Sequence, residues 1–301
     1  MDFTAHNAVF TAHGFASIAT DRKLRLHDRA GNVLHESKAL AGGHKLTALA
    51  ALDGGTRVVL GTTKLSVHDA ADGRRLEQLD GATKKGVFTD VVVLGDGAIV
   101  SSARFEATSA DNGLLVRRAG AVERIVLPGL QGQPCEVERL VRAPRTDTLF
   151  CIAYSRGGAD EPHATLLFRV EPGGAVHRLA QLRGLLPGQT QLAASDARVF
   201  VTDAPGDGAG HAVRAFSWDG APLGELAAGS INPALAVSPD GRTLALAKGE
   251  ALELLDAATL TARTTLELPF RIAARLAFDA SGAEFLCAGT HGVDRLSVPL
   301  P

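Results

Sequence analysis

The chain has 301 residues, of which 46% are hydrophobic and 21% charged, so it contains enough apolar material to bury a sizeable core. Its formal net charge of −2 offers no basic surface for a phosphate backbone, and we expect no nucleic-acid partner. No apolar run approaches the roughly 20 residues that span a bilayer, and the first residues show no secretory signal pattern, so we expect neither membrane insertion nor export.

The three cysteines, Cys135, Cys151 and Cys287, lie in apolar runs and cannot build a disulfide framework. We predict buried free thiols in a reducing compartment, and therefore a cytoplasmic protein. The preference for Arg over Lys and the heavy use of Ala and Gly are typical of a GC-rich bacterial genome.

One pattern of strands and turns recurs along the chain. It is clearest from Leu235 to Asp256, where an apolar strand, a Pro-Asp-Gly turn, a second apolar strand, a Gly turn and an alternating strand follow one another. Residues 263–266 supply a fourth strand. In chain order, the other second and third strands are predicted at 15–19 and 24–28, 57–60 and 65–69, 98–101 and 114–118, 149–152 and 167–171, 199–202 and 215–219, and 285–288 and 293–297.

Seven units with a period of about 45 residues predict an all-β fold, a seven-bladed β-propeller of four-stranded antiparallel blades. Each blade is too thin to bury its own faces, so the blades stack radially and close a ring. We expect a single domain over 1–301, with blades near 5–38, 45–80, 87–127, 135–181, 189–227, 232–267 and 272–301. The last unit ends after its third strand, so its outer strand is missing, supplied by the extreme N-terminus, or borrowed.

The repeat resembles the WD40 and YVTN-type propeller families over nearly the whole chain. Gly43-His44 precedes an apolar strand, as the Gly-His pair of that family does, and Trp218-Asp219 matches its terminal Trp-Asp. At the same place other repeats have His27-Asp28, His68-Asp69 and Leu255-Asp256, so the chain resembles a divergent relative of these families. The resemblance implies that His27 and His68 are packing residues.

Three adjacent repeats have long connections between their second and third strands, and we expect all three on one face of the ring. Loops longer than usual in a compact repeat tend to carry function. Because aromatic and arginine side chains anchor interfaces, the expected partner-binding residues are Arg104, Phe105, Tyr154, Arg156, Asp160 and Glu161. The third loop also contains Asp203, Asp207 and His211, a weak candidate metal site that matches no known calcium pattern.

Polar residues mark the predicted starts of the inner strands, around the mouth of the central channel. They are Lys45, Asp90, Glu136, Gln189, Asn232 and Arg271. A ring of mixed charge can hold a small polar ligand, although strand ends at a wet mouth are polar in any case. No spacing pairs the carboxylates for acid–base chemistry, and no nucleophile elbow or phosphate-binding loop is present.

Three functional hypotheses follow. The first is a non-enzymatic scaffold or adaptor, without cofactor, that docks another protein or peptide on the long-loop face. The second is a propeller lactonase or hydrolase with its site at the channel mouth, and it predicts loss of turnover on mutating Asp90 or Glu136. The third is a structural subunit of a larger complex, completed by a strand from another chain. The chain is expected to act as a monomer or within a hetero-complex.

Overall fold

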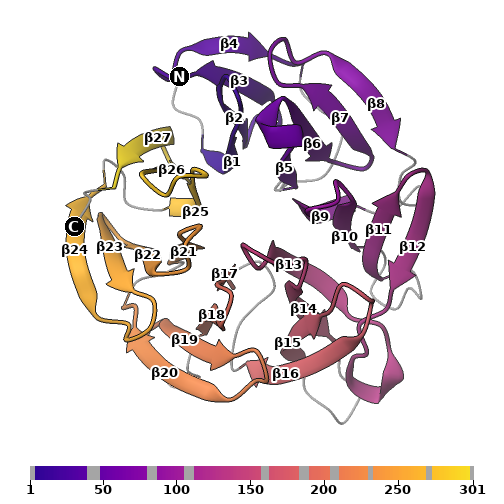
Figure 1. Ribbon diagram of the computed structural model, residues 1–301, viewed down its shortest axis with the longest axis vertical. Helices are drawn as coiled ribbons and strands as arrows, with labels where there is room; N and C mark the ends of the chain where they lie inside the picture. The colour runs from indigo at the N-terminus through magenta and orange to yellow at the C-terminus, as the bar shows by residue number, and fades with distance from the viewer. Residues whose placement is uncertain are drawn as a thin grey trace.

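The computed structural model describes residues 4–38, 48–79, 87–104, 112–156, 163–182, 190–203, 210–229, 233–268 and 273–298. Within these ranges, seven antiparallel sheets are arranged as a ring, and each is formed by strands that are consecutive in the chain (Figure 1). The predicted seven-bladed propeller is confirmed, with one correction: six blades have four strands, whereas the last has three among the described residues. The described residues contain no helix that is both long and apolar enough to cross a membrane.

Within each blade, the strands follow one another in chain order from the inner to the outer position (Figure 1). Blades 1 to 3 are β1 (Ala5–Phe10), β2 (Gly14–Ala19), β3 (Leu24–Asp28), β4 (Val33–Glu36); β5 (Leu49–Leu52), β6 (Arg57–Gly61), β7 (Leu65–Asp69), β8 (Arg75–Leu79); and β9 (Val87–Val93), β10 (Ile99–Arg104), β11 (Gly113–Arg118), β12 (Ala121–Ile125). Blades 4 and 5 are β13 (Glu136–Arg142), β14 (Leu149–Ser155), β15 (Ala164–Val170), β16 (Val176–Leu182); and β17 (Leu192–Ala194), β18 (Arg198–Asp203), β19 (Ala212–Ser217), β20 (Pro222–Ala227). Blades 6 and 7 are β21 (Ala234–Val237), β22 (Thr243–Lys248), β23 (Ala251–Asp256), β24 (Ala262–Glu267); and β25 (Ala273–Phe278), β26 (Glu284–Gly289), β27 (Gly292–Ser297). Short 3₁₀ turns, η1 (Asp53–Gly55) and η2 (Leu130–Gly132), lie between strands.

The core lies between the blades. The second strands are buried almost throughout, whereas outer strands such as β8 are exposed along most of their length. One cluster joins Phe150 of blade 4 to Val199 and Phe216 of blade 5. Burial of apolar surface against the next blade is therefore what holds each thin sheet in place.

The ring closes by direct packing of blade 1 against blade 7. Ala8 of β1 and Phe15 of β2 share a cluster with Leu286 and Ala288 of β26. Because β1 is the inner strand of blade 1, the described N-terminal strand does not supply the missing outer strand of blade 7. In the described part of the chain, β27 is consequently the outermost strand of that blade.

His27 and His68, which were expected to be packing residues, are both buried. The His27 ring stacks on Phe15 with centroids 4.2 Å apart, and its Nε2 lies 3.0 Å from Ser17 Oγ. His68 Nε2 lies 2.9 Å from Ser66 Oγ, and its Nδ1 lies 3.1 Å from the Gly73 carbonyl oxygen. Each imidazole thus packs within its own blade and forms a hydrogen bond with a serine hydroxyl of the same sheet. Both histidines therefore have a structural role.

These histidines predict a loss of stability in mild acid. Burial lowers the pKa of both His27 and His68 below 6.5, so the folded chain keeps the two rings neutral. As the pH falls below about 6.5, the unfolded chain binds protons that the folded chain does not, and stability decreases. Melting temperatures measured from pH 7.5 to 5.5 should therefore fall, and less steeply for the double variant His27→Gln, His68→Gln. An exposed control, His13→Gln, should keep the wild-type slope; an equal slope in the double variant would contradict the assignment.

The three cysteines are free and buried, as predicted. Burial raises the pKa of the Cys135 thiol to about 11, and it raises the pKa values of Cys151 and Cys287 as well. Thiols that stay protonated at neutral pH are poor nucleophiles, so these residues belong to the packing.

Candidate functional site

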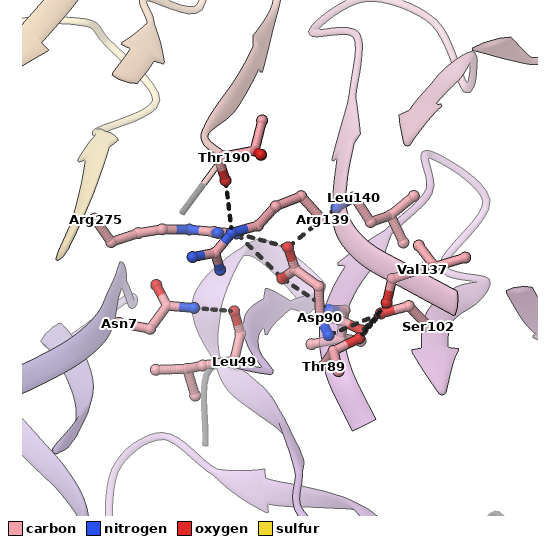
Figure 2. A network of polar contacts seen from close by, with 11 residues as sticks. Asn7, Leu49, Thr89, Asp90, Ser102, Val137, Arg139, Leu140, Thr190 and Arg275 are labelled. Atoms are coloured by element: carbon pink, nitrogen blue, oxygen red, sulfur yellow. Dashed lines mark hydrogen bonds and ion pairs between the residues drawn. The ribbon is translucent and has the colours of Figure 1, made fainter. Parts of the chain in front are cut away.

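Four of the inner strands share a local irregularity at the same position. The register with the second strand shifts by one residue in β1, β9, β13 and β25, which is the signature of a β-bulge. The residues that directly follow the bulges are all polar: Asn7, Asp90, Arg139 and Arg275. We call these four residues the axial cluster. A bulge redirects the side chain that follows it, and here it brings side chains from blades 1, 3, 4 and 7 to the axis of the ring (Figure 2).

Asp90 is the most heavily bonded member of the axial cluster. It is fully buried, and both carboxylate oxygens accept from Arg275 Nη2, at 3.1 and 3.0 Å. The backbone amides of Val91 and Leu140 donate to the same carboxylate at 3.0 and 3.1 Å. Through this one side chain, blade 3 is bonded to blade 4 beside it and to blade 7 across the ring.

The strand that carries Asp90 is also held from its other side. Thr89, the bulged residue, donates to the Val137 carbonyl at 2.8 Å and lies 2.7 Å from Ser102 Oγ. Ser102 Oγ in turn accepts from the Asp90 backbone amide at 2.8 Å. These bonds satisfy the polar groups that the bulge leaves without a ladder partner.

Arg139 is the most unusual member of the axial cluster. Its side chain extends from β13 towards Arg275, and the residue is 9% exposed. Its Nε donates to the Thr190 carbonyl at 3.4 Å, a long bond, and no carboxylate among the described residues forms an ion pair with it. Burial and the neighbouring Arg275 lower its pKa to about 10, while Asp90 and Glu138 oppose that change with smaller effects.

Asn7 completes the axial cluster on the side of blades 1 and 2. Its Nδ2 donates to the Leu49 carbonyl at 3.4 Å. Leu49 also lines a hollow of about 920 Å³ on the face where the inner strands end. Its apolar wall includes Val9, Ala51, Val93 and Ala277, and Val91, the neighbour of Asp90, belongs to it too. The hollow thus extends to residues that directly contact the axial cluster.

The residues predicted at the channel mouth lie in different places. Asp90 is in the axial cluster, whereas Glu136 is buried at the start of β13, where its Oε1 accepts from Arg156 Nε at 3.2 Å. Lys45, Gln189, Asn232 and Arg271 lie outside the described residues. Sequence reasoning missed Asn7, Arg139 and Arg275. The available signal was a polar residue inside an otherwise apolar inner strand, but a bulge cannot be read from strand periodicity.

Of the residues predicted to bind a partner, Arg104, Tyr154 and Arg156 lie at the bases of the long connections. These run from 105 to 112, from 156 to 163 and from 204 to 211, in three adjacent blades. Arg104 is the last residue of β10, and the Tyr154 ring lies 5.4 Å from that of His163 across the base of the second connection. Phe105, Asp160 and Glu161 lie outside the described residues.

The described members of the weak metal candidate, Asp203 and His211, bond to other groups of the chain. Asp203 is buried and forms an ion pair with Arg214 at 3.0 Å, and Asp207 lies outside the described residues. His211 uses its backbone carbonyl to accept from Ala228 and Gly229. Across the ranges that the structure describes, no three His, Cys, Asp or Glu side chains gather in a metal-binding arrangement.

Comparison with known proteins extends the fold assignment but goes no further. No protein-family model matches the chain, and no curated protein does. Among solved structures, a chain of hydrazine synthase from Kuenenia stuttgartiensis superposes with a TM-score of 0.72 at 12% identity, over 99% of this chain and 96% of that one. The likeness is one of fold alone. Unrelated functions share such folds, so the function has to be argued from this chain's own residues.

Proposed function

We propose that this protein is a non-enzymatic interaction module that docks a protein or peptide partner on the face where the inner strands begin. The observation that carries the proposal is the grouping of Glu136, Tyr154 and Arg156 at the base of a long connection. Glu136 pairs with Tyr154 in the β13–β14 ladder, and its buried carboxylate bonds Arg156, whose side chain remains 45% exposed. Ordered arginine and tyrosine side chains bind partners at a reduced entropic cost.

The environment of the carboxylates also favours binding over hydrolysis. A general base must be able to take a proton from a substrate or a water molecule. Asp90 is engaged by Arg275 and by two backbone amides, and Glu136 is engaged by Arg156. Both carboxylates are buried and already accept hydrogen bonds from groups of the chain itself, so the lactonase or hydrolase alternative has less support from the geometry.

The third hypothesis, a structural subunit, has one observation in its favour. The third strand of blade 7, β27, has no described strand beyond it, whereas the third strand of every other blade is covered by a fourth. An uncovered strand edge is a template for strand addition by another chain.

The docking proposal is tested by a triple variant, Arg104→Ala, Tyr154→Ala, Arg156→Ala. Partners captured by the tagged wild-type protein from an extract of its source should be lost with the triple variant, with a loss of at least about 2 kcal/mol in binding free energy because such residues dominate interfaces. The melting temperature should change little, since all three residues lie at the end of a strand or directly after it. The matched control is Arg74→Ala with Arg178→Ala, both exposed near the outer rim. Undiminished capture by the triple variant would place the docking surface elsewhere.

A further inference from the structure

Arg139 is a buried cation that forms no ion pair with a described carboxylate. Asp90 is bonded to Arg275, so the Arg139 guanidinium has no carboxylate bonded to it. Glu138, the preceding residue in β13, is half-buried, and its effect on the pKa of Arg139 is smaller than that of Arg275. The segments 183–189 and 269–272, which precede Thr190 and Arg275 in the chain, contain no aspartate or glutamate.

A purely structural role does not account for this arrangement. Apolar side chains of similar volume stabilise a buried position at least as well as a charged group that lacks a partner. The Arg139 guanidinium has one long hydrogen bond through Nε, and its two terminal nitrogens have no bond to any described residue. Arg275 uses only Nη2 for Asp90, which leaves its other donors available as well. Two planar guanidinium groups with spare donors face the same part of the axis (Figure 2).

The chemistry of the site selects a carboxylate. A guanidinium group presents parallel N–H donors that match the two oxygens of a carboxylate. Two guanidinium groups with spare donors match a single carboxylate, whereas Asp90 and Glu138 would repel a second negative charge on the ligand. The hollow adds apolar side chains near Leu49 and Val91, beside the axial cluster, although charged residues such as Arg142 and Asp279 also line it.

We propose that the axis of the propeller holds a binding site for a monocarboxylic acid, with the carboxylate between Arg139 and Arg275 and an apolar tail in the hollow lined by Val9, Ala51 and Val93. The site is independent of the docking face, because it requires no partner protein and lies on other residues. Its failure therefore leaves the docking proposal standing, and the reverse is also true.

The test uses the purified full-length chain with octanoate, acetate and inorganic phosphate as probes, followed by calorimetry and thermal melting. Octanoate should bind, raise the melting temperature, and bind more tightly than acetate because its tail removes apolar surface from water. Arg139→Met should weaken octanoate binding about tenfold to a hundredfold, the range for loss of a charge-assisted hydrogen bond. Arg139→Lys should lose less of the octanoate affinity than Arg139→Met. Arg74→Met, at a side chain that is 70% exposed, should keep the wild-type affinity.

The ligand-free Arg139→Met variant gives a second readout. If Arg139 serves a ligand, the ligand-free variant should melt at the wild-type temperature or higher, because a buried charge with no bonded ion-pair partner is removed. A lower melting temperature would show that Arg139 is structural and would overturn the proposal. So would an octanoate affinity that Arg139→Met leaves unchanged, or the absence of octanoate binding. Equal binding of acetate and octanoate would overturn the placement of the tail, and tighter binding of phosphate would overturn the choice of a carboxylate.

Discussion

Asp90→Ala should lower the free energy of unfolding by about 3–5 kcal/mol, the range for removing one partner of a buried ion pair. The loss has two physical causes. Arg275 would keep a largely buried charge without its partner, and the backbone amide of Leu140 would lose its acceptor. Urea denaturation followed by circular dichroism measures the effect directly.

Two controls separate this ion pair from a general effect of removing aspartate. Asp219, which is 89% exposed and pairs with Arg169 at 3.3 Å, should tolerate Asp219→Ala with little change in stability. The double variant Asp90→Ala, Arg275→Met should recover part of the loss, because no unpaired charge remains. A cost below about 1 kcal/mol for Asp90→Ala would mean that the pair does not join the blades, and it would restore Asp90 as a candidate base.

Phe150→Ala should cost about 3–5 kcal/mol, the range for truncating a fully buried aromatic side chain. Phe150 comes from β14 and is buried in the cluster that joins blades 4 and 5. The indole ring of Trp218 packs against it edge-on, with centroids 5.6 Å apart. The change therefore leaves a cavity at an inter-blade contact and removes an aromatic pair at the same time.

Trp218 is the single tryptophan, so its fluorescence reports on this contact without labelling. Its emission should shift in Phe150→Ala even under conditions where the protein stays folded. Phe150→Leu should cost less because it keeps most of the volume, and Val122→Ala, at a residue that is 57% exposed, should stay within about 0.5 kcal/mol of wild type. An unaltered spectrum in Phe150→Ala would show that blades 4 and 5 do not pack as described.

The ends of the third strands show how accurately the repeat pattern predicts strand positions. Strands predicted to end at Asp28, Asp69, Arg118, Asp256 and Ser297 end there in the structure. Those predicted to end at Glu171 and Asp219 end at Val170 and Ser217. The agreement has a simple cause: strand and turn signals are local, and seven repetitions average out the errors of each.

The candidate functional residues could be predicted only in part from the sequence. Residues 104, 154 and 156 were predicted because loop length and residue type identify a long connection, and the structure places them at the ends of β10 and β14 or directly after them. The ion pair of Glu136 with Arg156 joins a strand start to a loop base, and Asp90 with Arg275 joins residues 185 positions apart. Pairings over such distances depend on how many blades separate two strands in the closed ring.

By itself, the sequence determined the architecture of this protein, because the period of its strands leaves no other way to bury seven thin sheets. It also determined that the cysteines stay free and that His27 and His68 belong to the packing. Only the tertiary structure decided which polar residues meet. A one-residue bulge in four inner strands brings Asn7, Asp90, Arg139 and Arg275 to the axis, and ring closure alone places blade 7 where its arginine reaches blade 3.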